Sequence, residues 1–427
     1  MGLIEARACQ KESARGGVVL LTAGQDPSYV FGLTITLSQR GIHVHVVGND
    51  RVDDPEFHKS DRITFVDCGG IQANAGSLAK LWQLTLYYAR LIAYVTFRSP
   101  KIVHILWNSK LEYFDRTLLT LYFKLIGKKV VLTAHNVNKA KRDSCDSFLN
   151  RVTLRIQYRL LDRIFLHTEK MKGELAQEFG VSPAKVAVMP FPMNIHVPNT
   201  ELTVSEAKQK LGLRPHEHTI LFFGRIVPYK GLECLVDAFH RFARRDANCR
   251  LIIAGEPMKG FESYMQDVRR AIAEGEGADR IRCELEYIPD SETEVYFKAA
   301  DVVVLPYKNI FESGVVFLAY RFGLPVIASD VGSFREELTD SGAGSVFEQG
   351  NPASLAETLG AFFQSGLYKN AASHRQRIRE YGNAHHSWQI VGKITDRVYS
   401  DLLNVRQPLT TATSRISSSP SETAQHF

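Results

Sequence analysis

The chain has 427 residues, of which 44% are hydrophobic and 23% are charged. This balance is typical of a globular protein with two or more domains, and it excludes collagen-like and wholly disordered chains. The net charge of +6 is uneven, because residues 1–200 carry +9 and residues 201–427 carry −3. A basic first half suits an anionic surface or substrate. No recognised nucleic-acid motif accompanies this charge, so nucleic acid is not an expected partner.

The start of the chain and its cysteines bear on location. Residues 1–16 contain charges but no apolar core, so they do not resemble a secretory signal. No apolar run reaches the roughly 18 residues of a membrane-spanning helix. The six cysteines form no C-x-x-C pair and no cluster with histidine, which favours reduced thiols. We therefore expect a cytoplasmic protein, with peripheral attachment to the cytoplasmic face of a membrane as an option.

Short apolar runs that predict strands alternate with segments of helical spacing along the whole chain. In the first half the predicted strands are Val18–Thr22, His43–Gly48, Ile63–Asp67, Ile102–Trp107, Val130–Ala134, Ile164–His167 and Val186–Pro190. In the second half they are Ile220–Phe223, Leu251–Gly255, Arg280–Cys283, Val302–Tyr307, Pro325–Ser329 and Ser345–Phe347. Repeated strand–helix order implies parallel sheets covered by helices. We therefore predict an α/β protein with two Rossmann-like domains that face each other across a cleft.

The predicted domain boundary lies in a stretch that contains two prolines and one short helical segment. We assign residues 1–195 to an N-terminal domain, 196–218 to a linker and 219–385 to a C-terminal domain. Residues 386–406 are predicted to form a C-terminal helix that could return to the first domain. Residues 407–427 are rich in Ser and Thr and are predicted to be disordered.

Two segments of the first half allow a second interpretation. Ser77–Phe97 has only Lys80 and Arg90 as charges. A buried crossover helix is the favoured interpretation, because parallel strands need such helices. The alternative is an amphipathic helix that lies on a membrane, with Trp and Tyr at the interface. The basic run Lys139–Arg142 suits the phosphate groups of a lipid, and it is equally typical of a solvated face. Three further bases of this kind are Arg151, Arg155 and Arg159.

The loop after the strand Ile220–Phe223 contains Gly224, Arg225 and Lys230, and a helical segment begins at Leu232. In open α/β sheets, ligands bind at the carboxyl ends of parallel strands. Two fixed positive charges beside a helix N-terminus suit a diphosphate. A merely solvated basic loop is the competing interpretation of this short motif.

Five motifs over about residues 215–350 occur in the order and spacing of one known family. They are Gly224-Arg225-x4-Lys230-Gly231, Ala254-Gly255-Glu256, the run ADVVVLP from Ala300 to Pro306, the run GLPVIA from Gly323 to Ala328, and Asp330-Val331-Gly332-x3-Glu336. The chain resembles the family-4 glycosyltransferases of the GT-B fold, of the type that builds bacterial surface polysaccharides. The resemblance implies a retaining transfer of a hexose from a nucleotide-diphosphate sugar to a glycan or lipid-linked glycan. It also implies that no metal and no cofactor is needed.

The same resemblance implies the residues that bind the donor. Arg225 and Lys230 would hold its phosphates, and Ser313-Gly314-Val315 would add amide donors at a helix N-terminus. A plain N-cap and turn is the alternative for Ser313-Gly314. The remaining donor-binding positions are Gly24, Gly224, Gly255 and Ile288. The loop around Gly24 departs from the family, because it lacks the usual pair of glycines.

His135 and Glu312 are the expected catalytic residues. His135 ends a predicted strand at its carboxyl side, where the family has a histidine near the transferred sugar; a structural histidine is the alternative. The family's Glu-x7-Glu pair would fall on Ile310 and Leu318, neither of which is acidic. We expect Glu312 to take the polar role left vacant at Ile310, and Leu318 to pack against the sheet. His104, in mid-strand, is expected to be a core histidine with satisfied hydrogen bonds.

Two other functions stay open. The missing Glu pair suggests a non-catalytic nucleotide-sugar-binding protein. Rossmann-like halves also suit a dinucleotide-dependent oxidoreductase, although no G-x-G-x-x-G follows the first strand. Neither a D-x-D motif nor a His/carboxylate cluster is present, so no metal is expected. The expected partners are a nucleotide-diphosphate sugar, a glycan or lipid-linked acceptor and an anionic membrane surface.

Overall fold

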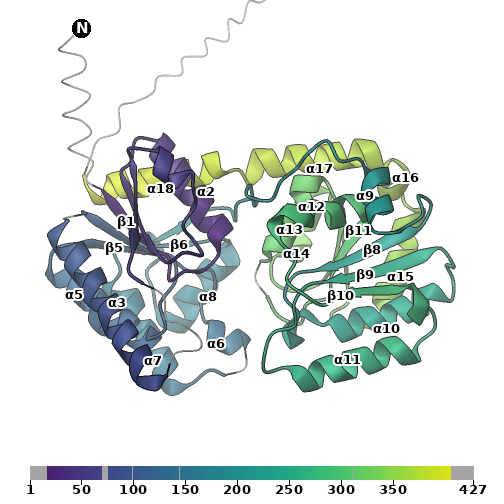
Figure 1. The fold of residues 1–427 in the computed structure, drawn as a ribbon, viewed down its shortest axis with the longest axis horizontal. Helices are drawn as coiled ribbons and strands as arrows, with labels where there is room; N and C mark the ends of the chain where they lie inside the picture. The colour runs from purple at the N-terminus through teal and green to yellow at the C-terminus, as the bar shows by residue number, and fades with distance from the viewer. Residues whose placement is uncertain (1–16, 70–75, 99, 144, 311, 405–427) are drawn as a thin grey trace, which may run out of the picture.

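The structure is a computed structural model of the chain. It describes residues 17–69, 76–98, 100–143, 145–310 and 312–404. The predictions for residues 1–16 and for the tail 407–427 lie outside these residues. Figure 1 shows two α/β domains side by side, with the C-terminal helices running across both. Each domain contains a parallel sheet, which confirms the predicted fold class.

The first sheet has seven strands in the order β3-β2-β1-β4-β5-β6-β7, and the second has six in the order β10-β9-β8-β11-β12-β13. The strands of the first sheet are β1 (Val18–Leu21), β2 (Val44–Gly48), β3 (Ile63–Asp67), β4 (Ile102–Ile105), β5 (Lys129–Thr133), β6 (Arg163–Leu166) and β7 (Val186–Val188). Those of the second are β8 (His218–Phe223), β9 (Cys249–Ala254), β10 (Ile281–Glu284), β11 (Val302–Leu305), β12 (Val326–Ser329) and β13 (Gly344–Phe347). All thirteen predicted strands are present, with ends displaced by at most two residues.

Helices cover both faces of each sheet, so the strands are apolar on both sides. In β1, Val19 and Leu21 belong to one core cluster, and Val18 and Leu20 belong to another. This alternation explains why the strands appear in the sequence as continuous apolar runs.

The first domain contains α2 (Pro27–Gln39), η1 (Phe57–Lys59), α3 (Ser77–Phe97), α4 (Glu112–Phe114), the π-helical turn η2 (Asp115–Leu119), α5 (Thr120–Leu125), α6 (Lys139–Arg142), α7 (Phe148–Leu160), α8 (Glu169–Phe179) and η3 (Pro183–Lys185). The second domain contains α9 (Val204–Lys210), η4 (Pro228–Lys230), α10 (Leu232–Ala243), α11 (Glu262–Glu274), η5 (Ala278–Arg280), α12 (Asp290–Ala299), α13 (Gly314–Phe322), α14 (Phe334–Ser341), α15 (Pro352–Gln364), α16 (Gly366–Lys369) and α17 (Ala371–His385).

The last helix, α18 (Trp388–Leu402), packs against α2 of the first domain, whereas α17 packs against α13 of the second. Gly32 of α2 permits this approach, because a Cβ there would lie 2.0 Å from the Trp388 ring. The Tyr399 hydroxyl of α18 lies 2.6 Å from His104 Nδ1, and His104 Nε2 lies 2.8 Å from the Thr133 hydroxyl. His104 is therefore the buried, fully bonded core histidine that the sequence predicts.

Helix α3 connects β3 to β4 as a crossover helix, but the prediction that it is buried is wrong. Within α3 the buried residues are Tyr88, Leu91 and Val95. Its opposite face is apolar and uncovered: Leu78 is 84% exposed and Trp82 is 68% exposed. Among the described residues, none of the helices has both the length and the apolar character needed to cross a membrane.

Candidate active site

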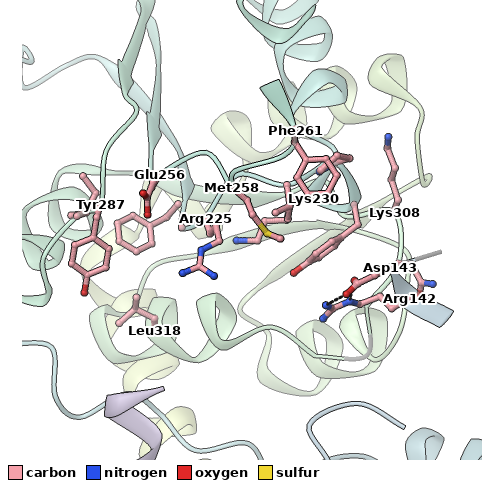
Figure 2. A pocket seen from close by; sticks show the side chains of 18 of the residues that line it. Arg142, Asp143, Arg225, Lys230, Glu256, Met258, Phe261, Tyr287, Lys308 and Leu318 are labelled. Atoms are coloured by element: carbon pink, nitrogen blue, oxygen red, sulfur yellow. Dashed lines mark hydrogen bonds and ion pairs between the residues drawn. The ribbon is translucent and has the colours of Figure 1, made fainter. Parts of the chain in front are cut away.

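Two adjoining cavities lie between the domains, with volumes of about 1120 Å³ and about 310 Å³. Asn194, Tyr229, Lys230 and Leu318 line both cavities. The second domain supplies the loops after β8 and β9, and the first domain supplies α6 and the start of α2. Figure 2 shows Arg225 and Lys230 beside each other in the larger cavity. The predicted donor cations therefore face a space where the two domains meet.

Lys230 and Arg225 form an uncompensated positive site. Lys230 is only 9% exposed, and its Nζ lies 5.6 Å from the centre of the Tyr307 ring. Burial, together with the charges of Arg225 and Arg142, lowers the pKa of the Lys230 ammonium to about 7. Among the described residues, neither Lys230 nor Arg225 has a carboxylate partner. A bound anion would relieve both the burial cost and the repulsion between these cations.

Gly224 and Gly255 allow the loops after β8 and β9 to approach each other closely beside this site. Gly224 has φ of 93°, and a Cβ there would lie 3.2 Å from Lys230 Nζ. Gly255 has φ of 148°, and its Cβ would lie 2.3 Å from the Gly224 carbonyl oxygen. Both conformations favour glycine. Gly224, Gly255 and Ile288 all line the larger cavity, as the prediction of donor-binding residues requires.

The N-terminus of α13 opens into the smaller cavity. Ser313 caps this helix, because its hydroxyl accepts a hydrogen bond of 3.3 Å from the Val315 amide. Ser313, Gly314 and Val315 all line the cavity, together with Lys230. The positive end of a nine-residue helix and a buried ammonium therefore share one wall. Both the N-cap interpretation and the anion-site interpretation of Ser313-Gly314 fit this geometry.

Glu312 is a buried carboxyl group at the edge of the same cavity. It lines the smaller cavity, and its Oε2 atom is buried without a hydrogen-bond partner. Burial, followed by the charge of Glu337, raises its pKa well above the usual value. Buried polar atoms are nearly always bonded, so an unpartnered carboxyl oxygen beside a cavity suggests a ligand hydroxyl as its missing partner.

His135 lies behind the cavity wall. Its ring stacks on Trp107 at 4.6 Å and meets the edge of Tyr29 at 4.9 Å, and Tyr29 rather than His135 lines the smaller cavity. His135 Nδ1 lies 3.2 Å from His167 Nε2, and His167 Nδ1 lies 3.4 Å from the Met189 carbonyl oxygen. Burial lowers the pKa of both histidines, so both are neutral at neutral pH. If His167 donates to Met189, His135 donates in turn and keeps an unprotonated Nε2, which is buried without a partner.

The loop after β1 differs from the prediction. Gly24 is buried against Asn49 and does not line either cavity. Asp26, Ser28 and Tyr29 line the smaller cavity instead. Asp26 has φ of 40° and caps α2, since its Oδ1 accepts a hydrogen bond from the Tyr29 amide at 3.1 Å. The Asp-Pro pair at a strand-to-helix junction was the sequence signal for this turn.

The basic run on α6 and the residue Leu318 also have positions that the sequence did not predict. Lys139, Lys141 and Arg142 line the larger cavity, and Arg142 lies 4.7 Å from the centre of the Tyr229 ring across the domain boundary. Leu318 is buried in the core as expected, but it also borders both cavities. A charge run and an apolar helix do not by themselves reveal which of their side chains reach a cavity.

A metal centre was not expected from the sequence. In the part of the chain that the structure describes, no three His, Cys, Asp or Glu side chains lie close enough to hold a metal ion together. Independence from metal stays a prediction, to be tested in solution.

The two halves of the chain match two protein-family models. Residues 28–196 match Glycosyltransferase Family 4, and residues 203–385 match Glycosyl transferases group 1. The two matches together cover every strand except β1, and they include most of the residues that line the two cavities.

Curated relatives match part of the chain. A D-inositol 3-phosphate glycosyltransferase from Corynebacterium efficiens is 25% identical over 240 residues, which is 54% of this chain and 56% of that protein. Another, from Streptomyces bingchenggensis, is 28% identical over 251 residues, which is 57% of this chain and 53% of that protein. The chain thus spans little more than half the length of these relatives.

Solved structures share the fold over nearly the whole chain. A sucrose-phosphate synthase from Thermosynechococcus elongatus superposes with a TM-score of 0.73 at 17% identity, covering 92% of this chain and 100% of that one. Anabaena Alr3699/HepE in complex with UDP-glucose gives a TM-score of 0.69 at 16% identity, covering 90% and 99%. At such identities the likeness concerns the fold alone.

Proposed function

Because the chain belongs to the glycosyltransferases of the GT-B fold, we propose that it transfers a hexosyl group from a nucleotide-diphosphate sugar to a hydroxyl of a glycan or lipid-linked glycan. The observation that carries this proposal is the site of Arg225 and Lys230, two cations without a carboxylate partner among the described residues. The N-terminus of α13 opens beside Lys230. A diphosphate would satisfy all three at once.

The chemistry follows from the charge that develops on the leaving group. In the transfer, the oxygen of an acceptor hydroxyl bonds to the anomeric carbon of the hexose, and the bond from that carbon to the diphosphate oxygen breaks. The hydroxyl proton passes to the departing diphosphate. The electron pair leaves with the nucleoside diphosphate. Fixed cations and helix amides aimed at that charge lower the barrier, because they need no reorganisation during the reaction. Arg225, Lys230 and the start of α13 would have this role.

Two further residues complete the proposed site. Glu312 would accept hydrogen bonds from hydroxyls of the transferred sugar, which supplies the missing partner of its buried oxygen. His135 lies behind Tyr29 and would take part as a neutral imidazole, with an unprotonated Nε2 that has no hydrogen-bond partner among the described residues. Retention of configuration and independence from metal are the parts of the proposal that rest on family resemblance. The anomeric configuration of the product and activity in a chelator test them.

The relatives and structural neighbours guide the choice of substrates to test. Because Alr3699/HepE was solved with UDP-glucose, UDP-glucose is the first donor, with GDP- and ADP-glucose beside it. Because the curated relatives are named for D-inositol 3-phosphate, that compound is one acceptor, and a lipid-linked glycan is the other. For a lipid-linked acceptor, we propose that the protein works as a peripheral protein at the cytoplasmic face of a membrane.

The test combines donor binding with turnover. Calorimetry with the three nucleotide sugars should find one that binds, and that donor should be consumed with formation of a glycosylated acceptor. Binding of a donor with no transfer to any acceptor would favour the second candidate, a non-catalytic nucleotide-sugar-binding protein. The loss of the family's Glu pair at Ile310 and Leu318 is the observation that supports this second candidate. No binding of any nucleotide sugar would contradict both.

A further inference from the structure

We propose that helices α3, α5 and α7 together form a docking face for an anionic lipid bilayer. We refer to this surface as the three-helix face. The inference deepens the proposed function by naming the partner surface, and it rests on that function only in supposing that the bilayer carries the acceptor. Figure 1 shows α3 and α5 on the side of the first domain away from the second domain, with α7 at its lower edge.

Large apolar side chains on all three helices are open to solvent. On α3, Leu81 and Trp82 follow Leu78 at helical spacing. The exposed set on α3 is Leu78, Leu81, Trp82 and Phe97; that on η2 and α5 is Leu118, Leu121 and Leu125; that on α7 is Phe148, Leu149 and Ile156. Phe148 is 85% exposed. Soluble proteins seldom leave so many neighbouring large apolar side chains uncovered unless the surface binds something.

The three helices form one continuous surface. The Tyr88 hydroxyl of α3 donates a hydrogen bond of 2.7 Å to Asp115 of η2, and the hydroxyls of Thr96 on α3 and Tyr122 on α5 lie 2.8 Å apart. Arg116 of η2 donates to Asn150 of α7 at 2.7 Å. The exposed apolar residues therefore stand on elements that are bonded to one another.

Charge identifies the partner as anionic. The sequences of α3, α5 and α7 contain no Asp and no Glu, yet they contain six bases. These are Lys80, Arg90, Lys124, Arg151, Arg155 and Arg159. The acid of η2, the turn that contributes Leu118, is Asp115, and it is buried. Lys124 and Arg151 are paired with Asp162 and Asp146. Among the described residues, Lys80, Arg155 and Arg159 have no carboxylate partner. Exposed apolar side chains flanked by basic residues, with no exposed acidic residues, are typical of a helix that lies on an anionic membrane.

A helix of the second domain offers a matched contrast. Helix α11 is also amphipathic and on the outside of the molecule, but it contains Glu262, Asp267 and Glu274, and none of its large apolar residues is exposed. A helix that meets only water can carry acids freely. The lack of acids on the three-helix face is therefore not a general feature of this chain.

The face continues into the candidate active site. Asn150 of α7 donates a hydrogen bond of 3.0 Å to Asn138, the N-cap of α6. The next turn, α6, brings Lys139 and Arg142 to the wall of the larger cavity. A lipid head group held beside α7 would thus lie next to the basic entrance of the cavity. This arrangement suits an acceptor whose lipid stays in the bilayer while its glycan enters the site.

Co-sedimentation with vesicles tests the inference without donor or acceptor. The protein should bind phosphatidylcholine vesicles that contain phosphatidylserine far better than pure phosphatidylcholine vesicles, and high salt should weaken the binding. The double variant Trp82→Ser/Phe148→Ser should lose about tenfold or more in partitioning, because two large side chains no longer insert. Arg155→Glu/Arg159→Glu should lose binding to the anionic vesicles. Val204→Ser, an exposed apolar residue on α9, is the control and should bind normally.

Tryptophan fluorescence provides a second readout. Trp82 is the exposed member of the three tryptophans, since Trp388 is buried and Trp107 is half-buried. Its emission should shift to the blue on anionic vesicles, and Trp82→Ser should abolish that shift. Equal sedimentation with both kinds of vesicle, or with neither, would overturn the proposal. Self-association that these variants abolish, without vesicle binding, would show instead that a second copy covers the face. Normal transfer to a water-soluble acceptor by the surface variants would separate this proposal from the proposed function.

Discussion

The loops after β1 and β8 occupy the same place in the two domains, yet they carry opposite charge. Each follows the third strand of its sheet, with the next two strands of the chain on one side and the remaining strands on the other. Both contain a left-handed glycine, Gly24 at φ of 66° and Gly224 at φ of 93°. The loop after β8 then presents Arg225 and Lys230, whereas the loop after β1 presents Asp26.

The fold therefore supplies two equivalent sheet edges, one in each domain. The loops after β1 and β8 give these two edges different chemical roles. The second-domain edge suits the diphosphate of a donor, because its charges are positive and unpaired. The first-domain edge, with Asp26, Tyr29 and the nearby His135, suits neutral hydroxyl groups. Changes at the second edge should therefore alter donor binding, and changes at the first should alter turnover. The fold alone would not decide which edge binds the donor and which affects turnover.

Replacing Glu312 should have the largest effect on transfer. Glu312→Gln replaces a carboxyl oxygen by an amide NH2, which cannot accept a hydrogen bond from a sugar hydroxyl, so transfer should fall about tenfold to a hundredfold. Because burial raises the pKa of Glu312 above its unfolded value, the folded state loses stability as pH rises from the unfolded pKa through the folded one. The variant should therefore melt at the same temperature or higher at neutral pH. Transfer rates and calorimetric melting test both parts, and near-normal transfer would remove Glu312 from the site.

The pH dependence of donor binding should report on Lys230. Its pKa is about 7 in the free protein, and a bound diphosphate should raise it, since an opposite charge favours the protonated form. Affinity for UDP-glucose should therefore be highest below this pKa and fall by up to about tenfold per pH unit above it. Calorimetry in buffers of different ionisation enthalpy should detect proton uptake on binding. The control, Lys230→Arg, should show no uptake; equal uptake by this variant would assign the proton to another group.

His135 should affect turnover at the first-domain edge. Its loss removes one neutral hydrogen-bonding group, so His135→Ala should lower kcat by up to about tenfold and leave donor affinity nearly unchanged. Trp107→Phe is the matched control, because it alters the stacking partner and leaves the imidazole in place. A rise in KM alone would make His135 a binding or structural residue and would blur the contrast between the two edges.

Much of the fold could be predicted because burial on both faces of a sheet produces long apolar runs. The strands β1 and β8 are examples. β1 ends one residue before the predicted Thr22, and β8 begins two residues before the predicted Ile220, because His218 and Thr219 also pair with β9. The exposed face of α3 was predicted only as the alternative to a buried crossover helix. An apolar segment looks the same in sequence whether one face or all faces are covered, and only the positions of α5 and α7 decide which.

The candidate site could be predicted where a residue type is tied to a local backbone form. Gly224 and Gly255 adopt conformations that favour glycine, and Ser313 is a helix cap. All three line a cavity, and their role in donor binding stays a prediction. The role of α6 was missed because its distance from the second domain depends on how the two domains meet. Gly24 does not line either cavity for a different reason, since Asn49, on the loop after β2 of the same domain, lies against it.

The central claim is that Arg225 and Lys230 hold the donor diphosphate, and calorimetry on single variants tests it most directly. Arg225→Ala and Lys230→Ala should each weaken UDP-glucose binding about tenfold or more, since each removes a charge-assisted contact. Arg245→Ala, which removes an exposed cation of the same domain away from both cavities, should bind normally. Arg225→Ala and Arg245→Ala should melt as the wild type does, and Lys230→Ala should melt at the same temperature or higher, because burial penalises the charge that it removes. Unchanged affinity in both Arg225→Ala and Lys230→Ala, with the wild type binding the donor, would contradict the claim.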